Sequence, residues 1–425
     1  MSRLIFHVDV NSAFLSWESA RRVSEGKADL RLIPSAVGGD PESRTGVILA
    51  KSIPAKKYGV KTGEPISAAL RKCPTLVLAR PDFRLYESCS RAFMDICREY
   101  APVVEKFSID ECFLDMTGTG LIFPDPIATA HEIKDKIRAR LGFTVNIGIG
   151  ENKLTAKMAS DFEKPDKVHT LFASEIESKL WTLPVRELYS VGQSTAARLE
   201  SAGISTIGAL AKCDIDSICG LIGAKAGRQL HDYANGIDDS PVSAEVSAAK
   251  GYSVSTTLSE DITDRENALG VLLELTDSVC MRMRADGVLC TCAAVSLRTA
   301  SFKNRSHQRK FDEATDITSE IFEIAKRLLD ELWDGHTPLR LLGVALTGLT
   351  REQNIQLTLF PDEDAERQRE KSRLLDRTVD SIRSRYGSET IRRCTVCRSP
   401  LEVGRKYKAQ LENKIKDKEK IDEDT

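Results

Sequence analysis

Short apolar runs alternate with amphipathic stretches over the first 170 residues of the chain. The run RLIFHVDV at 3–10 predicts a strand, and NSAFLSWESARR, which follows it, has helical spacing. Further strands are predicted at 45–50, 103–110, 112–118 and 144–150, and further helices at 84–101, 127–141 and 152–165. Strands that alternate with helices in this way indicate an α/β or α+β sheet domain.

The pattern changes twice after this region. From 185 to 241, short apolar stretches separated by glycines predict compact helical hairpins. From 245 to 349 strands return, most clearly in VSLRTASF and RLLGVALTGL, around helices predicted at 266–284 and 318–333. The tail from Pro361 is highly charged, and we expect it to be mostly helical or disordered.

Composition narrows the protein class. A length of 425 residues, with 41% hydrophobic and 29% charged residues, suits a globular protein of two to four domains. The net charge of −2 gives no bulk attraction for polyanions, so a nucleic-acid role would depend on local patches. The chain has no apolar run long enough for a membrane span, and its start does not resemble a signal peptide, so we expect it in the cytoplasm.

Eleven scattered cysteines suit reduced thiols better than a disulfide framework. Only Cys394 and Cys397 have the spacing of metal ligands, and a lone pair is weak evidence for zinc.

Three carboxylates stand at the ends of predicted strands. Asp9 ends the first strand, and Asp110 and Glu111 lie at the junction of two later strands. If these strands share a sheet, the carboxylates converge and could hold Mg²⁺, which prefers oxygen ligands and often binds together with substrate phosphates. From position alone, the simpler explanation is that each acid caps a strand or a turn.

Three longer motifs change the balance between these alternatives. They are VDVNSAFLSWE at 8–18, FSIDECFLD at 107–115 and IGIGENKLTAKMASDFEKP at 147–165, followed by the glycine hairpin after Leu188. In this order and spacing they resemble the Y-family DNA polymerases over about residues 3–350. The resemblance implies an α+β multidomain, right-hand polymerase with palm, fingers, a helical thumb and an α/β little finger.

The domain limits expected from this resemblance follow the changes in pattern. The palm and fingers would span 1–184, with the fingers inserted at about 20–80. A thumb with a helix-hairpin-helix would span 185–241, and the little finger 245–350. Residues 351–425 would hold a clamp-binding peptide and a charged tail.

The resemblance also implies roles for single residues in the first domain. Asp9, Asp110 and Glu111 would bind two Mg²⁺ ions, assisted by the backbone carbonyl of Val10. Phe14 would be a steric gate that excludes the 2′-hydroxyl of ribonucleotides, whereas without the motif it could equally be a core aromatic. Lys153 would contact the triphosphate, although a solvated surface lysine would otherwise be the default.

The fingers segment AKSIPAKKYGVKTG departs from the family pattern. It has Ile53 and Lys56 where the family supplies a tyrosine and an arginine to the triphosphate. Ile53 cannot donate a hydrogen bond, so we interpret it as a wall over the nascent base pair. Lys56 keeps the charge without the bidentate fork, and Ser52 could compensate.

Two further segments indicate contacts with DNA. The stretch 296–311 carries five basic residues and no acid, and Arg298, Lys303 and Arg305 would bind phosphates without reading sequence. A solvated hairpin is the alternative. The backbone at Gly192 would hold a phosphate at a helix N-terminus, although glycine turns also join helices for packing reasons alone.

The pentapeptide QLTLF follows the last predicted strand. It resembles the sliding-clamp-binding peptide of bacterial polymerases, in which Gln356 would fix the register while Leu357, Leu359 and Phe360 would be buried by the clamp. This implies a bacterial protein, which we expect to be a monomer. The long tail also resembles the UmuC-like members, so the branch within the family stays open.

Taken together, the resemblance implies a translesion DNA polymerase. It would add deoxynucleoside triphosphates to the 3′-hydroxyl of primer–template DNA with two Mg²⁺ ions, with low fidelity and without proofreading. One rival is an accessory factor that bridges DNA and the clamp but has lost catalysis. A nucleotide cyclase with a similar palm is a second rival, which the thumb hairpin and the clamp peptide disfavour.

Overall fold

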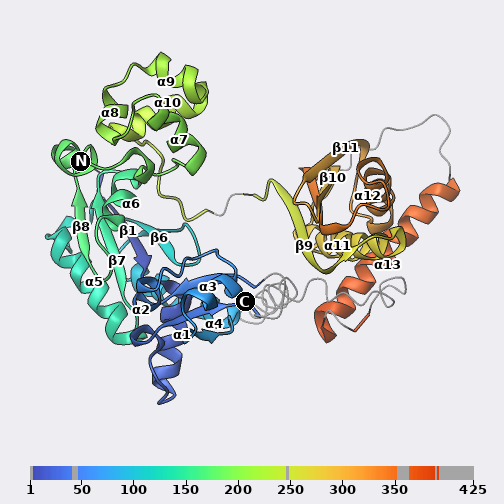
Figure 1. The fold of residues 1–425 in the computed structure, drawn as a ribbon, viewed down its shortest axis with the longest axis horizontal. Coiled ribbons are helices and arrows are strands. Elements are labelled where there is room, and N and C mark those ends of the chain that lie inside the picture. Colours follow the sequence, from blue (N-terminus) through green and yellow to red (C-terminus); the bar gives the residue numbers. More distant parts are fainter. Residues whose placement is uncertain (1–2, 41–45, 246–247, 352–362, 388–389, 392–425) are drawn as a thin grey trace. The chain divides into compact units, whose positions relative to one another are not determined.

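The computed structural model describes residues 3–40, 46–245, 248–351, 363–387 and 390–391. The chain divides into two compact units, with the division between Val246 and Ser247. Figure 1 shows the elements of each unit. None of the helices in the described ranges combines the length and the apolar character that crossing a bilayer requires.

The first unit is built on a five-stranded sheet with the order β5-β6-β1-β7-β8, in which only the β7–β8 pair is parallel. Its strands are β1 (Ile5–Val10), β5 (Val103–Lys106), β6 (Glu111–Asp115), β7 (Val145–Gly150) and β8 (Val168–Leu171). Helices α1 (Ala13–Ser24), α4 (Phe83–Arg98), α5 (Pro126–Leu141) and α6 (Lys153–Asp161) belong to the same region. Apart from β8, where no strand is predicted, these elements lie close to the ranges that the hydrophobic pattern predicts.

Alternation along β1 separates a core face from a polar face. Phe6, Val8 and Val10 are buried in a cluster with residues of α4 and α5, whereas His7 contacts Ser160 of α6. Since successive side chains of a strand point to opposite faces, Asp9 lies on the same face as His7 and α6.

Two glycines of β7 allow α6 to lie directly on this face. A Cβ at Gly148 would lie 2.0 Å from the carbonyl oxygen of Ala156, and one at Gly150 would lie 2.3 Å from the Thr155 hydroxyl. Any larger residue would therefore push α6 away from the sheet. The glycines of the IGIG motif thus set how closely α6 approaches β1.

A smaller sheet with the order β3-β2-β4 forms a separate layer within 30–79. It consists of β2 (Ser35–Gly38), β3 (Ile48–Lys51) and β4 (Val77–Ala79), with helices α2 (Ile53–Lys57) and α3 (Ile66–Lys72). Its apolar residues form their own small core, which includes Ala36, Ile48 and Ile66. This layer occupies the range expected for the inserted fingers.

Residues 185–234 form the helical part of the first unit. The helices are α7 (Gln193–Ser201), α8 (Ile207–Lys212), α9 (Ile215–Ile222) and α10 (Ala224–Ala234). Their core is continuous with Leu154 and Met158 of α6. Trp181, which precedes these helices in the sequence, is joined to the end of α10, because its indole N–H donates to the carbonyl of Ala234 at 2.9 Å.

The second unit contains a four-stranded antiparallel sheet with the order β11-β10-β12-β9. Its elements are β9 (Gly251–Ile262), α11 (Arg265–Ala285), β10 (Leu289–Thr299), β11 (Asn304–Thr315), α12 (Thr318–Leu332) and β12 (Leu339–Thr350). Tyr252, Val295 and Leu342 belong to the core that the sheet forms with α11 and α12. The hydrophobic pattern alone does not single out β9.

A further helix, α13 (Glu363–Tyr386), packs on this unit through ion pairs. Asp376 accepts a hydrogen bond from the backbone N–H of Thr318 at 2.8 Å, so it caps the N-terminus of α12 from another helix. Arg284 of α11 pairs with Asp380 at 2.6 Å, and Arg383 pairs with Asp277 at 2.7 Å. The sequence indicates a helical or disordered tail here but not this contact with α11 and α12.

Candidate active site

The strand register brings the predicted carboxylates to one place. Asp9 and Glu111 are directly opposite each other in the β1–β6 pair, and the N–H of Val10 donates to the carbonyl of Asp110 at 3.0 Å. Asp9 is only 6% exposed. Asp110 receives a hydrogen bond from the Ser108 hydroxyl at 2.7 Å. Asp9 and Glu111 therefore lie side by side on the polar face of the sheet, and Asp110 adjoins them at the end of β1 and lines a pocket together with Asp9.

Burial and nearby cations act in opposite directions on Asp9. Burial raises the pKa of Asp9 to about 6, against the lowering effects of Lys164 and Lys157. The neighbouring His7 is fully buried, its Nδ1 lies 2.8 Å from the Ser160 hydroxyl, and burial holds its pKa well below the usual range. The His7 imidazole is thus neutral and supports Glu111. The distance between Nε2 of His7 and Oε2 of Glu111 is 3.9 Å.

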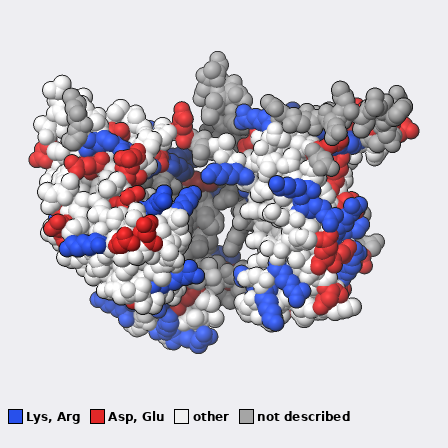
Figure 2. Space-filling view, turned by 90° about the horizontal axis from the view of Figure 1, so that it is seen from above, with Lys and Arg blue, Asp and Glu red and all other residues white. Residues whose placement is uncertain are grey.

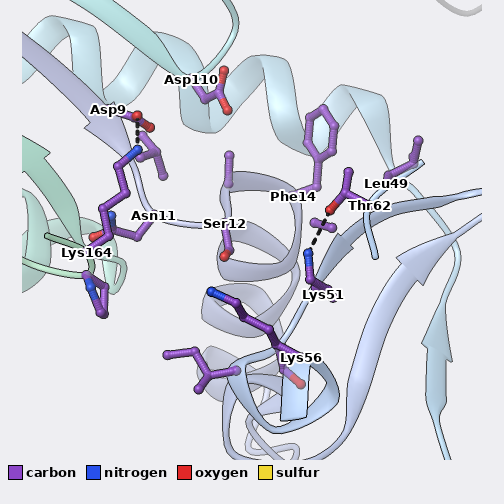
Figure 3. A pocket seen from close by; sticks show the side chains of 16 residues that line it. Asp9, Asn11, Ser12, Phe14, Leu49, Lys51, Lys56, Thr62, Asp110 and Lys164 are labelled. Carbon is purple, nitrogen blue, oxygen red and sulfur yellow. Dashed lines mark hydrogen bonds and ion pairs between the residues drawn. The ribbon is translucent and has the colours of Figure 1, made fainter. Parts of the chain in front are cut away.

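Two lysines of the 147–165 motif, to which the sequence analysis assigns no role, contact these acids. Lys157 of α6 pairs with Glu111 at 2.6 Å, and its Nζ also lies 3.9 Å from Asp9. Lys164 donates to Asp9, as Figure 3 shows. Both lysines also face Asp161, at 3.6 Å from Lys157 and 2.8 Å from Lys164.

The loop that carries Lys164 is fixed by two buried asparagines. The Asn11 side chain accepts from the N–H of Asp166 at 2.9 Å, and Asn146 donates to the carbonyl of Glu163 at 2.6 Å. Asn11 and Asn146 are themselves joined by a hydrogen bond of 3.0 Å. The turn between β1 and α1, which contains Asn11, and the strand β7, which contains Asn146, therefore hold Lys164 beside Asp9.

A pocket of about 420 Å³ opens next to the carboxylates. Its wall includes Asp9, Phe14, Lys56, Asp110 and Lys164, and Figure 3 shows these side chains around a common space. The wall thus combines carboxylates, ammonium groups and one aromatic ring. Such a set can hold a metal-bound phosphate chain at one end and an apolar group at the other.

Phe14 lies between this pocket and an aromatic cluster. Its ring stacks on Tyr86 with a centroid separation of 4.7 Å and makes edge contacts with Trp17 and Phe83. Trp17 and Tyr86 are fully buried, whereas Phe14 is only partly buried. One side of the Phe14 ring is thus supported by the core, and the residue also lines the pocket.

The fingers residues differ in what they offer to the pocket. Lys56 lines it, and so does Lys51, whose ammonium donates to the Thr62 hydroxyl at 3.2 Å. Ile53 also lines it and is 57% exposed.

Ser52 also lines the pocket, but its hydroxyl is used within the protein. It caps α2 by accepting from the N–H of Ala55, and it donates to the carbonyl of Ile33. The structure therefore gives no support to the prediction that Ser52 compensates for the bidentate fork that is missing at Lys56.

Lys153 lies in a different pocket. Its ammonium pairs with Glu105 at 2.6 Å and sits over the ring of Phe113. That second pocket, of about 160 Å³, also contains Tyr189 and Tyr233. The structure therefore places Lys164, and not Lys153, with Asp9 and Phe14, which differs from the prediction for Lys153.

The predicted DNA contacts fall in both units. Gly192 is the residue before α7, and a Cβ there would meet no atom within 4 Å. In the second unit, Arg298 and Asn304 are paired across the β10–β11 hairpin, and Lys303 is exposed in the turn between these strands.

Arg305 lies on the other face of this hairpin. Its cross-strand partner is Leu297, which is buried among the residues that face α11 and α12. The guanidinium donates to the carbonyl of Leu332 at the end of α12. The structure thus separates Arg298 from Arg305, which the sequence prediction groups together.

Figure 2 shows acidic side chains interspersed with lysine and arginine on the visible surface of each unit.

Three sequence features are not placed on this site by the structure. The QLTLF segment with Gln356, Leu357, Leu359 and Phe360 lies outside the described residues, as do Cys394 and Cys397. Within the described ranges, no three or more His, Cys, Asp or Glu side chains are arranged as a ready metal cluster. At Asp9 and Glu111, lysine ammonium groups contact the carboxylate oxygens instead.

Comparisons with known proteins agree with this geometry. Residues 8–161 match the impB/mucB/samB family, 249–359 match the C-terminal domain of the same family, and 186–238 match the thumb domain of DNA polymerase iota. A solved structure of a Y-family DNA polymerase chimera superposes with a TM-score of 0.70 at 23% identity, covering 84% of this chain and all of that chain. The predicted right-hand fold is therefore confirmed.

Curated relatives match along nearly the whole chain. DNA polymerase IV of Clostridium acetobutylicum is 44% identical over 394 residues, which covers 92% of this chain and 98% of the relative. DNA polymerase IV of Clostridium kluyveri is 37% identical with the same coverage, and DNA polymerase IV 1 of Bacillus subtilis is 36% identical, covering 92% of each chain. The chain therefore belongs to the Y family of DNA polymerases, which are DNA-directed DNA polymerases.

Proposed function

We propose that this protein is a translesion DNA polymerase that extends a primer with deoxynucleotides in the pocket between Asp9, Phe14 and Lys164. The observation that carries the proposal is the shared pocket itself. It combines acids that suit a metal, ammonium groups that suit a triphosphate and an aromatic ring that suits a sugar.

The carboxylates have the donor chemistry that Mg²⁺ requires. Asp9, Asp110 and Glu111 offer hard oxygen ligands from adjacent strand ends, and Val10 is joined to Asp110 by its backbone N–H. We propose that these residues hold two Mg²⁺ ions, which would supply activation of the primer hydroxyl and charge stabilisation at the leaving pyrophosphate.

Lys164 and Lys56 are the proposed triphosphate contacts. Both line the pocket, Lys164 from the loop after α6 and Lys56 from α2. An ammonium is a flexible point charge that pairs well with phosphate oxygens. Lys56 thus replaces the guanidinium that the family pattern would place there, while Lys164 takes the role first predicted for Lys153.

The sugar and base of the nucleotide would occupy the remainder of the pocket. Phe14 is held by Tyr86 behind it, so its ring would resist displacement by a 2′-hydroxyl. On the fingers side the wall includes Leu49, Ala50 and Thr62, which are small or medium-sized. Side chains of this size leave room for a distorted base pair, which supports low fidelity and synthesis past damaged bases.

Binding of primer–template DNA would use both units. Glycine at 192 is not required by internal packing, since a Cβ there would meet nothing, so the site is open to a phosphate at the start of α7. In the second unit, the sheet face opposite α11 and α12 carries Arg298 with Ser296 and Ser306. Short polar side chains beside a cation suit contact with a phosphate backbone.

We further propose that the QLTLF segment at 356–360 binds the sliding clamp. The support is the sequence pattern and the position of the segment, which begins six residues after the end of β12 in the sequence. A tether of this kind raises the local concentration of the polymerase at the primer end without adding a catalytic contact.

Primer extension by an Asp9→Ala variant tests the proposed function. Loss of a carboxylate ligand should reduce the extension rate by roughly a thousandfold or more, while primer–template affinity changes little, because phosphate contacts remain. Asp95→Ala is the matched control, since Asp95 is an exposed acid of α4 that pairs with Arg98.

Each outcome of this experiment discriminates between the alternatives. Wild-type extension that is lost in Asp9→Ala and kept in Asp95→Ala supports the proposal. A wild-type protein that binds DNA but does not extend a primer would indicate the accessory-factor alternative. Full activity of Asp9→Ala would show that the carboxylate site is wrongly assigned.

A further inference from the structure

Lys157 and Lys164 occupy the carboxylate oxygens that the proposed metal ions would need. Lys157 lies 2.6 Å from Oε1 of Glu111, and Lys164 donates to Oδ2 of Asp9. A lysine ammonium and a divalent cation that contact the same carboxylate oxygen lie close together. Their repulsion makes simultaneous contact unfavourable. Metal binding and these ion pairs are therefore in competition.

Asp161 is placed to receive both lysines. It is the last residue of α6, four positions after Lys157 and three before Lys164. Its two oxygens face different lysines, with Oδ1 at 2.8 Å from Lys164 and Oδ2 at 3.6 Å from Lys157. Each lysine can thus leave the metal-binding acids without losing a carboxylate partner.

Burial makes such a partner necessary for Lys157 in particular. Its side chain is only 12% exposed, whereas that of Lys164 is 36% exposed and that of Asp161 is 46% exposed. A largely buried ammonium without a nearby carboxylate is strongly disfavoured. Lys157 therefore depends on Asp161 if a metal ion takes Glu111 and Asp9.

We propose that Asp161 is a positioning residue that draws Lys157 and Lys164 away from Glu111 and Asp9 when a divalent cation binds there. This inference rests on the proposed metal role of Asp9 and Glu111. The paired carboxylates Asp9, Glu111 and Asp161 and the two lysines have a net charge of −1, which one cation of charge +2 changes to +1. The lysines must then turn to Asp161 or to incoming phosphate.

Mn²⁺ titration of the full-length protein, followed by electron paramagnetic resonance without DNA or nucleotide, tests this inference apart from activity. Lys157→Met and Lys164→Met should each tighten Mn²⁺ binding, by roughly threefold or more, since a competing charge is removed. Lys167→Met is the control, because within the described ranges Lys167 pairs only with the exposed Glu163, and it should leave binding unchanged.

Asp161→Asn should act in the opposite direction. Without Asp161 the lysines rest more firmly on Glu111 and Asp9, so Mn²⁺ binding should weaken by roughly threefold. A simple loss of negative charge near the site would also weaken binding, and the triple variant Lys157→Met, Lys164→Met, Asp161→Asn separates the two causes. If Asp161 acts through the lysines, its effect nearly disappears in that background, and Asp161→Glu restores wild-type binding.

The results that would overturn the inference are equally definite. They are weaker Mn²⁺ binding by the folded lysine variants, or an Asp161→Asn effect that is as large without the lysines as with them. Lys164→Met is the variant to rely on if Lys157→Met lowers the melting temperature, because Lys164 is more exposed. Unchanged Mn²⁺ binding by Asp9→Ala would instead refute the proposed metal site.

Discussion

The two sheets of this protein use their polar faces in opposite ways. In the first unit α6 covers the polar face, and Asp9, Glu111, Lys157 and Lys164 form close ion pairs beneath and beside it. In the second unit both helices pack on the apolar face, and Ser296, Arg298 and Ser306 lie on the other face of the sheet. Metal chemistry needs charges fixed by surrounding structure, whereas phosphate binding needs a face that a long polymer can reach.

This contrast predicts that variants of the first unit change the chemistry, while variants of the second change only how DNA and clamp are held. Phe14→Val should have the largest effect on substrate choice. A smaller side chain removes the clash with a 2′-hydroxyl, so discrimination against ribonucleotides should fall by roughly 10- to 100-fold. Competing single-nucleotide incorporation of the two sugar types measures this ratio.

Folding must be checked for this variant, because the Phe14 ring packs on Tyr86, Trp17 and Phe83. Removing part of a packed ring lowers stability by about 1–3 kcal/mol, and a thermal melt shows whether the variant is folded at the assay temperature. If a folded Phe14→Val variant kept wild-type discrimination, Phe14 would be only a core aromatic.

The clamp variant tests whether the QLTLF segment at 356–360 holds the clamp. Truncation of two buried anchors, Leu359→Ala with Phe360→Ala, typically costs about 2 kcal/mol or more, which is roughly thirtyfold in affinity. Clamp-stimulated synthesis should therefore disappear while unstimulated synthesis continues. Loss of the unstimulated activity as well would show that these residues support the folded polymerase instead.

Two double variants, one on each face of the β10–β11 hairpin, should show the smallest change in DNA binding. Their comparison is the most specific, because only the face that loses its cations differs. Arg298→Ala with Lys310→Ala removes cations from the face opposite the helices, whereas Arg305→Ala with Arg309→Ala removes cations that contact Leu332 and Glu331 of α12. Only the first pair should weaken binding to DNA of any sequence and reduce the salt slope, by about 0.9 for each DNA phosphate that the protein no longer neutralises. An equal salt slope of DNA binding for both double variants would show that the face of the hairpin on which the cations lie has no influence on DNA binding.

Sequence reasoning placed Asp9, Asp110 and Phe14 near one another because their positions follow from strand ends and a short motif. Asp9, Asp110 and Phe14 all border the predicted site, and Lys56 lines it from the fingers. Such placements depend on local structure, which alternating apolar residues and helix spacing predict well.

The choice between Lys153 and Lys164 depended on tertiary structure. Lys153, Lys157 and Asp161 follow one another at intervals of four along α6, so helix periodicity places all three on one face. Which of them reaches Asp9 depends on how α6 lies on β1 and β7, and that is set by the close approach at Gly148 and Gly150. Lys164 comes after the helix, in a loop held by Asn11 and Asn146, which no periodicity indicates.

Two other differences have simpler causes. Ser52 could have been recognised as a helix cap, since it precedes a short helix with proline in its first turn. Arg305 could not have been separated from Arg298 by pattern, because β11 carries polar side chains on both of its faces, and alternation then does not show which face is covered.

Steady-state kinetics of Lys164→Ala and Lys153→Ala test the central claim that one pocket, lined by Asp9, Phe14 and Lys164, binds the incoming nucleotide. If Lys164 contacts the triphosphate, its removal should raise the KM for deoxynucleotide by roughly tenfold or more, as expected when a charge-assisted phosphate interaction is removed. Lys153→Ala, which lies in the second pocket, should leave that KM within about twofold, in line with a residue remote from the nucleotide. A raised KM for Lys153→Ala together with an unchanged KM for Lys164→Ala would contradict this assignment.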